Sequence, residues 1–362
     1  MSLDIALKYL LWVCVGGLLV SKFTTRKHIR VLGNKRERWS ITAVLILLIP
    51  MVYWCAMRST SFGDTGAYKS YFEKAPSSLS KVISFAQSQK KDQFFFGFTA
   101  VVKCLITDDY RVYFGVMAAI QILCVGLIYR KYSRSFWISL FLFVASTDYI
   151  QWMFNGSRQF LAAAISFTAL PFIVNRKYIP AILLVFLGSL MHKTALLLLP
   201  VIFIVQGKAW NKKTMLIMLG TLLAIVFVSE FTSFLDGILR DTQYENVVSD
   251  WEGNNDDGTN ILRVLVYSVP TIIALLNKAK IEKSDNILIN ICVNMSIVST
   301  AFYVVSMFTS GIFMGRLPIY MSLYNYILLP WELRHCFKKN TQLFFTISMW
   351  MAYFLFFCYT YM

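Results

Sequence analysis

The chain has 362 residues, of which 57% are hydrophobic and only 15% charged, and its mean hydropathy is +0.58. Soluble domains carry about 25% charged residues, so this composition excludes an ordinary soluble fold and predicts an all-α, polytopic transmembrane helical bundle. The formal charge of +16 does not indicate nucleic-acid binding, because the basic residues form short clusters between apolar runs and no nucleic-acid motif accompanies them.

Apolar runs suited to membrane helices recur along the whole chain. The first, Ile5–Val20, lacks the basic leader and the small-residue cleavage site of a signal peptide, so we expect it to be a membrane helix. A span needs about 20 apolar residues, and about twelve spans are predicted in a single transmembrane domain over residues 1–362. The predicted spans are 4–21, 40–57, 111–129, 135–151, 157–174, 179–191, 194–206, 214–229, 261–277, 286–308, 313–330 and 341–361.

The segments between the predicted spans differ in charge. Segment 230–260 carries eight acidic residues and one arginine, whereas another set of segments is strongly basic. The two sets alternate if both chain ends face outward, because cytoplasmic loops carry an excess of Lys and Arg. The basic segments are 22–38, 130–134, 176–177, 208–213, 278–283 and 334–339.

This alternation predicts three further features. Segments 58–110 and 230–260 become extracytoplasmic loops, the second of them acidic. The apolar stretch Phe94–Ile106 is too short to span, so we expect a re-entrant or interfacial helix. Residues 179–206 must be split by a turn at 191–193 into a short hairpin, which is tolerated where it is buried in protein.

Four polar residues are not explained by membrane insertion alone. Arg158 begins a predicted span beside the small residues Ala162, Ala163 and Ser166, which would let another helix pack closely. An arginine that snorkels to lipid headgroups explains Arg158 equally well. The others are Asp64, His192 and Arg316, for which an ordinary turn, a helix cap and an interfacial arginine are the alternatives.

The predicted topology brings these four residues to the outer membrane face, together with Arg111 and Arg263. Arginine is depleted on that side, so a cluster of arginines there needs a reason. Guanidinium groups offer forked donors to phosphate oxygens, and a lipid-linked pyrophosphate is one anion that would fit. The outward aromatics Tyr68 and Trp152 could stack on sugar rings, although the interfacial aromatic belt is the simpler explanation.

Signatures of other enzyme classes are missing from the sequence. It contains no P-loop, GxGxxG, GxSxG or HExxH motif, which argues against a nucleotide-dependent reaction. The seven cysteines are dispersed and form no CxxC pair, so we expect neither a disulfide framework nor a zinc site.

At these residues the chain resembles the EpsG-like branch of the Wzy-type bacterial polysaccharide polymerases. The resemblance rests on the span pattern and on three short sequence elements. Met191 replaces the aromatic residue that usually precedes the histidine in that family. The three elements are Asp64…Tyr68, the run from Ser157–Ala162 through Arg176-Lys177 to Met191–Ala195, and Gly315-Arg316-Leu317 followed by Tyr320.

The resemblance implies a multi-pass protein of the bacterial cytoplasmic (inner) membrane. It would join undecaprenyl-pyrophosphate-linked oligosaccharide repeat units into a capsule, exopolysaccharide or O-antigen, without cofactor, metal or nucleotide. A flippase and a chain-length regulator of the same pathway would be its partners.

The same resemblance implies roles for the candidate residues. Arg158 and Arg316 would stabilise the departing pyrophosphate, with Arg263 or Lys193 as helpers. His192, or else Asp64, would accept the proton of the attacking sugar hydroxyl.

Three other functions stay open at the level of sequence. A transporter or flippase of lipid-linked oligosaccharides would also be polytopic, although transporters often show internal repeats and charges at the membrane midplane. A membrane O-acyltransferase would also use a histidine in the membrane. A glycan ligase, which transfers a finished glycan to another acceptor, is chemically close to a polymerase.

Overall fold

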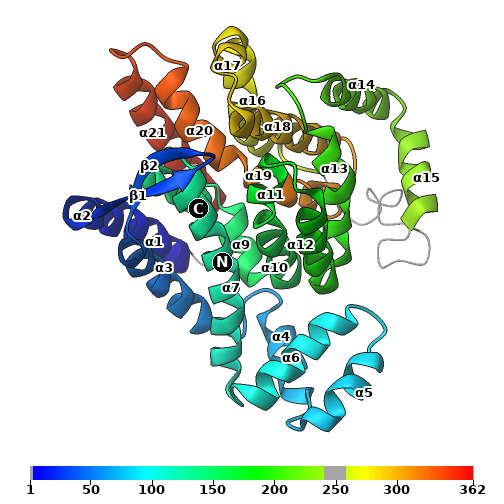
Figure 1. The fold of residues 1–362 in the computed structure, drawn as a ribbon. Helices are drawn as coiled ribbons and strands as arrows, with labels where there is room; N and C mark the ends of the chain where they lie inside the picture. Colours follow the sequence, from blue (N-terminus) through cyan, green and yellow to red (C-terminus); the bar gives the residue numbers. More distant parts are fainter. Residues whose placement is uncertain (1–2, 240–257, 362) are drawn as a thin grey trace. The chain divides into compact units, whose positions relative to one another are not determined.

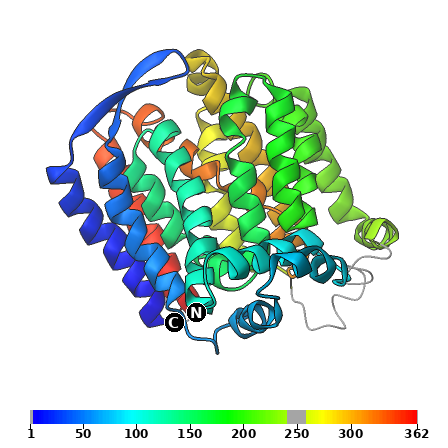
Figure 2. The same ribbon diagram turned by 60° about the horizontal axis from the view of Figure 1, so that its bottom comes forward.

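The computed structural model of the protein describes residues 3–239 and 258–361. This part of the chain is almost entirely helical, and its one sheet is a two-stranded hairpin (Figures 1 and 2). The expected all-α class is therefore confirmed. The chain divides into two compact units, unit 1 (Met1–Leu199 with Trp350–Met362) and unit 2 (Pro200–Met349).

Several helices of the described chain are suited to crossing a membrane. Five helices are long and apolar enough to cross a membrane. Two bent helix pairs raise the number to seven if each pair forms one span. The predicted count of about twelve is not confirmed, because several other predicted spans form helices of 10–17 residues. A 16-residue helix such as Ile41–Ala56 is about 24 Å long, shorter than a hydrocarbon core of about 30 Å.

Unit 1 contains apolar helices, the hairpin and a group of short helices (Figure 1). In chain order its elements are α1 (Leu3–Leu11), η1 (Trp12–Gly16), α2 (Gly17–Phe23), β1 (Arg26–Val31), β2 (Asn34–Trp39), α3 (Ile41–Ala56), α4 (Thr65–Lys74), η2 (Leu79–Lys81), α5 (Val82–Gln87), α6 (Gln93–Leu105), α7 (Tyr110–Tyr132), α8 (Phe136–Ala145), α9 (Asp148–Phe154), α10 (Ser157–Phe167), α11 (Leu170–Val174), α12 (Tyr178–Met191), η3 (Lys193–Leu197) and the last part of α21 (Gln342–Tyr361).

Helix α7 is the central element of unit 1 and packs against α3, α4, α6, α8 and α10. Asp109 caps its first turn, because the Asp109 side chain accepts the backbone N–H of Arg111 at 2.8 Å. A Cβ on Gly126 would lie 2.5 Å from Leu48 of α3, so this glycine lets the two helices approach closely. With 23 residues, α7 is about 34 Å long and can cross a bilayer.

The hairpin β1–β2 occupies the basic segment that sequence analysis assigned only as a loop. Its two-residue turn has Leu32 at φ 50° and Gly33 at φ 80°, positive angles at both central positions that suit the twist of paired strands. The backbone N–H of Ser40 donates to the carbonyl of Thr25 at 3.1 Å and closes the open end. Hydrophobic patterning could not reveal this hairpin, because nearly all of its residues are polar.

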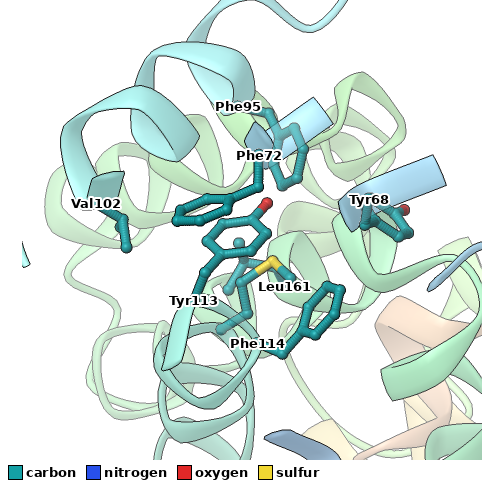
Figure 3. Packing of buried hydrophobic residues seen from close by; sticks show 8 residues of the cluster. Tyr68, Phe72, Phe95, Val102, Tyr113, Phe114 and Leu161 are labelled. Carbon is teal, nitrogen blue, oxygen red and sulfur yellow. The ribbon is translucent and has the colours of Figure 1, made fainter. Parts of the chain in front are cut away.

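The loop 58–110 folds into α4, η2, α5 and α6 at the end of α7 that begins at Tyr110. Its predicted apolar stretch forms the 13-residue helix α6, whose depth in the membrane stays a prediction. An aromatic cluster joins this loop to α7 and α10, and Phe72 stacks on Tyr113 with ring centroids 4.8 Å apart (Figure 3). Burial of these large rings therefore fixes the short helices against the long ones.

Helices α10 and α12 meet in a close crossing. A Cβ on Gly188 of α12 would lie 2.8 Å from the carbonyl oxygen of Ala162 in α10, and closer still to the Ser166 hydroxyl. The predicted small face of α10 therefore does receive a second helix. The predicted break also occurs, since α12 ends at Met191 and η3 begins at Lys193.

Unit 2 is organised around α18, whose residues are almost all buried. Asn294 of this helix donates to the carbonyls of Val205 and Lys208, both at 3.0 Å, and accepts the N–H of Trp210. Its elements are α13 (Leu198–Ile204, which starts in unit 1), α14 (Lys212–Val226), α15 (Val228–Leu239), α16 (Ile261–Leu276), α17 (Lys278–Ser284), α18 (Ile287–Val305), η4 (Met314–Arg316), α19 (Ile319–Ser322), α20 (Asn325–His335) and the first part of α21 (Gln342–Tyr361). Much of the predicted acidic loop 230–260 lies outside the described residues.

Candidate functional site

Arg158 lies in the first turn of α10 and forms an ion pair that the sequence did not predict. Its Nη1 lies 2.5 Å from Oδ2 of Asp92. The two side chains are 25% and 10% exposed, so the pair is largely shielded from water. The guanidinium also lies 5.7 Å from the Phe95 ring and 6.0 Å from the Tyr68 ring, within range of a cation–π attraction.

Asp92 directs its carboxylate to Arg158 because of its unusual backbone. It precedes α6 in the left-handed conformation, with φ 52°, and its side chain makes no capping bond to that helix. An aspartate directly before an apolar helix ordinarily caps it. The carboxylate is instead available to the arginine, and no pattern in the sequence indicates this.

Asp64 joins the same region through a reciprocal contact between two loops. Its Oδ2 accepts the backbone N–H of Gly156 at 3.3 Å, and its own N–H donates to Oδ1 of Asn155 at 3.2 Å. Gly156 has φ 81°, a conformation that favours glycine and lets α10 begin abruptly. The exposed carboxylate of Asp64 thus helps to hold the loop that carries Arg158.

Tyr68 connects the aromatic cluster to this polar region. Its ring is buried among the residues drawn in Figure 3, and its hydroxyl oxygen accepts the backbone N–H of Arg158 at 3.3 Å. Burial raises the pKa of the Tyr68 hydroxyl, and the nearby Arg158 opposes that shift. The hydroxyl therefore stays protonated at neutral pH. The predicted stacking of Tyr68 on a sugar would require its ring to be more exposed than it is in this structure.

Arg58 is a second buried arginine, and sequence analysis did not single it out. It is 5% exposed, and its Nη1 donates to the carbonyl of Met153 at 2.6 Å. The Ser157 hydroxyl donates to the same carbonyl at 2.7 Å, and the Gln121 amide donates to the Ser157 carbonyl at 2.9 Å. The guanidinium lies 4.1 Å from the centroid of the Phe114 ring. This network fixes the start of α10 immediately before Arg158.

His192 lies at the break between α12 and η3 and is 8% exposed. Its Nδ1 lies 2.7 Å from the Thr194 hydroxyl, which fixes the orientation of the ring. The preceding Met191 is partly buried and packs against the aromatic cluster that contains Tyr68. Lys193 is exposed.

Trp152 is half-buried and its ring covers Gly156. A Cβ on Gly156 would lie 2.7 Å from the Trp152 indole, so the glycine is needed for this close approach. Trp152 therefore borders the loop that precedes Arg158, and its stacking on a sugar stays a prediction.

Arg263 and Arg316 belong to unit 2, where both are half-buried. The backbone N–H of Thr259, just before α16, donates to the Ser306 carbonyl at 2.8 Å, and the two side-chain hydroxyls lie 2.8 Å apart. A Cβ on Gly315 would lie 2.6 Å from the Thr259 hydroxyl. The segments that carry the two arginines therefore share one end of unit 2.

A comparison with protein-family models shows to which family the chain belongs. The model of the EpsG family matches residues 41–362, which is most of the chain. The chain belongs to the EpsG family. EpsG proteins are related to the Wzy-type polysaccharide polymerases, so this multi-pass membrane protein has a role in polysaccharide biosynthesis. No curated protein and no solved structure matches the chain.

Unit 1 thus brings together several of the residues predicted for an EpsG-family site. Asp64 and Tyr68 contact the loop and helix that carry Arg158, and Trp152 covers the same loop. His192 follows a helix packed directly on α10. Asp92 and Arg58 were missed because a carboxylate before a helix is ordinarily read as a cap, and an arginine after a span as an interfacial charge.

Proposed function

We propose that this EpsG-family protein polymerises undecaprenyl-pyrophosphate-linked oligosaccharide units into a surface polysaccharide. The reaction would be a glycosyl transfer at the outer face of the cytoplasmic membrane, without metal or nucleotide. The observation that carries the proposal is the shielded Arg158–Asp92 pair, held by Asp64 and Tyr68 at one end of a membrane-length helix. Family membership supplies the class of reaction.

The leaving group explains the need for arginine. As the bond between the anomeric carbon and the pyrophosphate breaks, its electron pair moves to a pyrophosphate oxygen. A preorganised guanidinium in a poorly hydrated site stabilises that charge without reorganisation. In the proposal Arg158 and Arg316 take this role, Arg263 and Lys193 support them, and Tyr68 and Trp152 border the sugar.

Asp92 has a defined part in the same step. In the ligand-free site its carboxylate neutralises Arg158, which avoids a shielded and unpaired cation. An arriving pyrophosphate presents more negative charge and forked acceptors, so it would compete with Asp92 for the guanidinium. The pair would then hold Arg158 in position between catalytic cycles.

The attacking sugar hydroxyl must lose its proton as it bonds to the anomeric carbon. We assign the acceptor role to His192, because the contact with Thr194 fixes its ring and histidine is the side chain that most often accepts protons in catalysis. Asp64 is the second choice, since one of its carboxylate oxygens already accepts the Gly156 N–H.

Elongation by the purified protein tests this function. The protein in lipid nanodiscs would be given one lipid-linked repeat unit with chelator and without nucleotide, and products would be sized on gels. We expect a ladder from wild type, none from Arg158→Ala or Arg316→Ala, and a normal ladder from Arg334→Ala. Arg334 is the matched control because it is an exposed arginine in a basic segment predicted to lie on the other side of the membrane.

The other outcomes separate the alternatives. Transfer of the glycan to a different acceptor would identify a ligase, and movement of the lipid between leaflets without bond formation would identify a transporter. A full ladder from both arginine variants would reject the proposed site.

A further inference from the structure

The hairpin and the adjoining end of α7 form a second concentration of arginine in unit 1. Strands β1 and β2 carry six basic residues and one acidic residue, Glu37. Arg130, Lys131 and Arg134 at the end of α7 add three more basic residues. We call Arg36, Arg38, Arg130 and Arg134 the hairpin base.

Backbone hydrogen bonds fix two of these arginines in place. Nε of Arg38 donates to the Lys131 carbonyl at 3.0 Å, and Nε of Arg130 donates to the Trp39 carbonyl at 2.8 Å. The Trp39 ring packs 5.5 Å from Phe136, at the start of the next helix. The arginines are thus held by the fold of the backbone and not by carboxylates.

Among the residues that the structure describes, no carboxylate forms an ion pair with the hairpin base. The carboxylate of Glu37 lies 3.5 Å from Arg26, which faces Trp39 at the open end of the hairpin. Across the strands, Lys27 faces Arg38 and Arg30 faces Lys35, and like charges directly opposite one another are unfavourable. Burial, followed by the charges of Arg134, Arg36 and Arg130, lowers the pKa of Arg38 to about 10.

Chain connectivity places this cluster at the depth of the lipid headgroups. Strand β1 follows the apolar helix that ends at Phe23 after a gap of two residues, and β2 precedes α3 by one residue. The hydrogen bond between Ser40 and Thr25 holds the hairpin at this junction. Phe23 is 83% exposed at the same level, as expected for a side chain that meets lipid.

We propose that the hairpin base binds the phosphate headgroup of an anionic glycerophospholipid of the surrounding bilayer. Lipid phosphate is the anion that is always present at this depth, and guanidinium forks match its oxygens. A bound phosphate would offset the repulsion among the four arginines. The family match begins at residue 41, so the hairpin lies outside it, and the proposal does not depend on the polymerase function.

Lipid titration of the full-length protein tests the proposal. Protein purified in detergent would be titrated with phosphatidylglycerol, and bound lipid would be counted by native mass spectrometry. The test variant is Arg36→Gln/Arg134→Gln, because both side chains are exposed and neither makes a hydrogen bond or an ion pair with any described residue. The matched control is Lys338→Gln/Lys339→Gln, which removes the same charge from another exposed basic segment.

We expect the hairpin variant to lose roughly tenfold or more in affinity for phosphatidylglycerol, and the control to stay within about twofold of wild type. Wild type should bind phosphatidylcholine more weakly, and added salt should weaken phosphatidylglycerol binding. Equal losses in both variants, or none in the hairpin variant, would overturn the proposal. It would also fail if inorganic phosphate bound as tightly as the lipid, or if a poly-glutamate probe bound more tightly, which would indicate an acidic protein partner.

Discussion

The two ends of α7 show two ways in which a membrane protein holds arginine. Near Tyr110, Arg158 is paired with Asp92 and its helix is held by Tyr68 and Asp64. Near Tyr132, the hairpin base gathers four arginines that repel one another, and two of them, Arg38 and Arg130, donate to backbone carbonyls. Within the described part of the chain, a carboxylate compensates the arginine at the first end, and none pairs with the four arginines at the second.

This difference separates two kinds of anion binding. A compensated arginine is kept in position without ligand and releases its partner when a stronger anion arrives, which suits a substrate that must later leave. An uncompensated cluster favours an anion that stays bound. The opposite ends of one membrane-length helix also fit the predicted topology, with the basic hairpin inside and the Arg158 region outside.

The largest expected effect comes from Arg158→Lys, which keeps the charge but removes the guanidinium fork. If forked donation to the pyrophosphate matters, elongation should fall by roughly a hundredfold or more. The measurement is the initial rate of elongation in nanodiscs, with protein amount quantified in each sample. A lysine variant as active as wild type would show that charge alone suffices and would remove the contrast between the two ends.

A smaller effect is expected from Gly188→Ala at the crossing of α10 and α12. The added methyl would lie 2.8 Å from the Ala162 carbonyl, and such overpacking typically costs about 1–3 kcal/mol. The control is Gly220→Ala in α14, where no atom lies within 4 Å of the added group. Thermal unfolding in detergent should show a lower melting temperature for the first variant and an unchanged or higher one for the second.

Asp92→Asn should change binding more than it changes rate. The amide oxygen can still accept a hydrogen bond from Arg158, whereas the charge that competes with pyrophosphate is lost. We expect the KM for the lipid-linked donor to fall several-fold, with a loss of stability of about 1 kcal/mol from the shielded pair. A raised KM would mean that Asp92 itself helps to bind substrate.

The smallest expected effect is a change in stability whose direction should differ between the two ends of α7. In lipid-free detergent, Arg36→Gln/Arg134→Gln removes repulsion at the hairpin base and should raise stability by a few tenths of a kcal/mol. Asp92→Asn lowers stability at the other end of α7. Melting curves at low and high salt provide the measurement, because salt should reduce the gain of the hairpin variant. A loss of stability in both variants would refute the proposed difference.

The sequence predicted the features that depend on apolar patterning and on charge. The helical class, the break at His192 and the small face that receives Gly188 all follow from residue type and spacing. The ion pair of Arg158 depends instead on the left-handed backbone of Asp92, far away in the chain. The hairpin was missed because its strands are mostly polar and bury only a few apolar side chains, such as Val31.

The number of spans could not be predicted for a related reason. Hydropathy measures how apolar a run is, and it does not show where a helix stops. Unit 1 breaks the predicted span 135–151 between α8 and α9, where Thr147 has a positive φ. Broken helices of this kind are tolerated only where neighbouring protein supplies their hydrogen-bonding partners.

The contact at Gly188 also limits how far Arg158 and His192 can move relative to one another. Arg158 precedes Ala162 by four residues, and His192 follows Gly188 by four, so each lies about 6 Å along its helix axis from the crossing point. Because this distance is short, a tilt of either helix by about ten degrees around the crossing point would displace Arg158 or His192 by only about 1 Å. In the proposed mechanism, room for acceptor sugars of different bulk would therefore come from the loops around Asn155 and Thr194, while the helix crossing keeps the distance between Arg158 and His192 nearly constant.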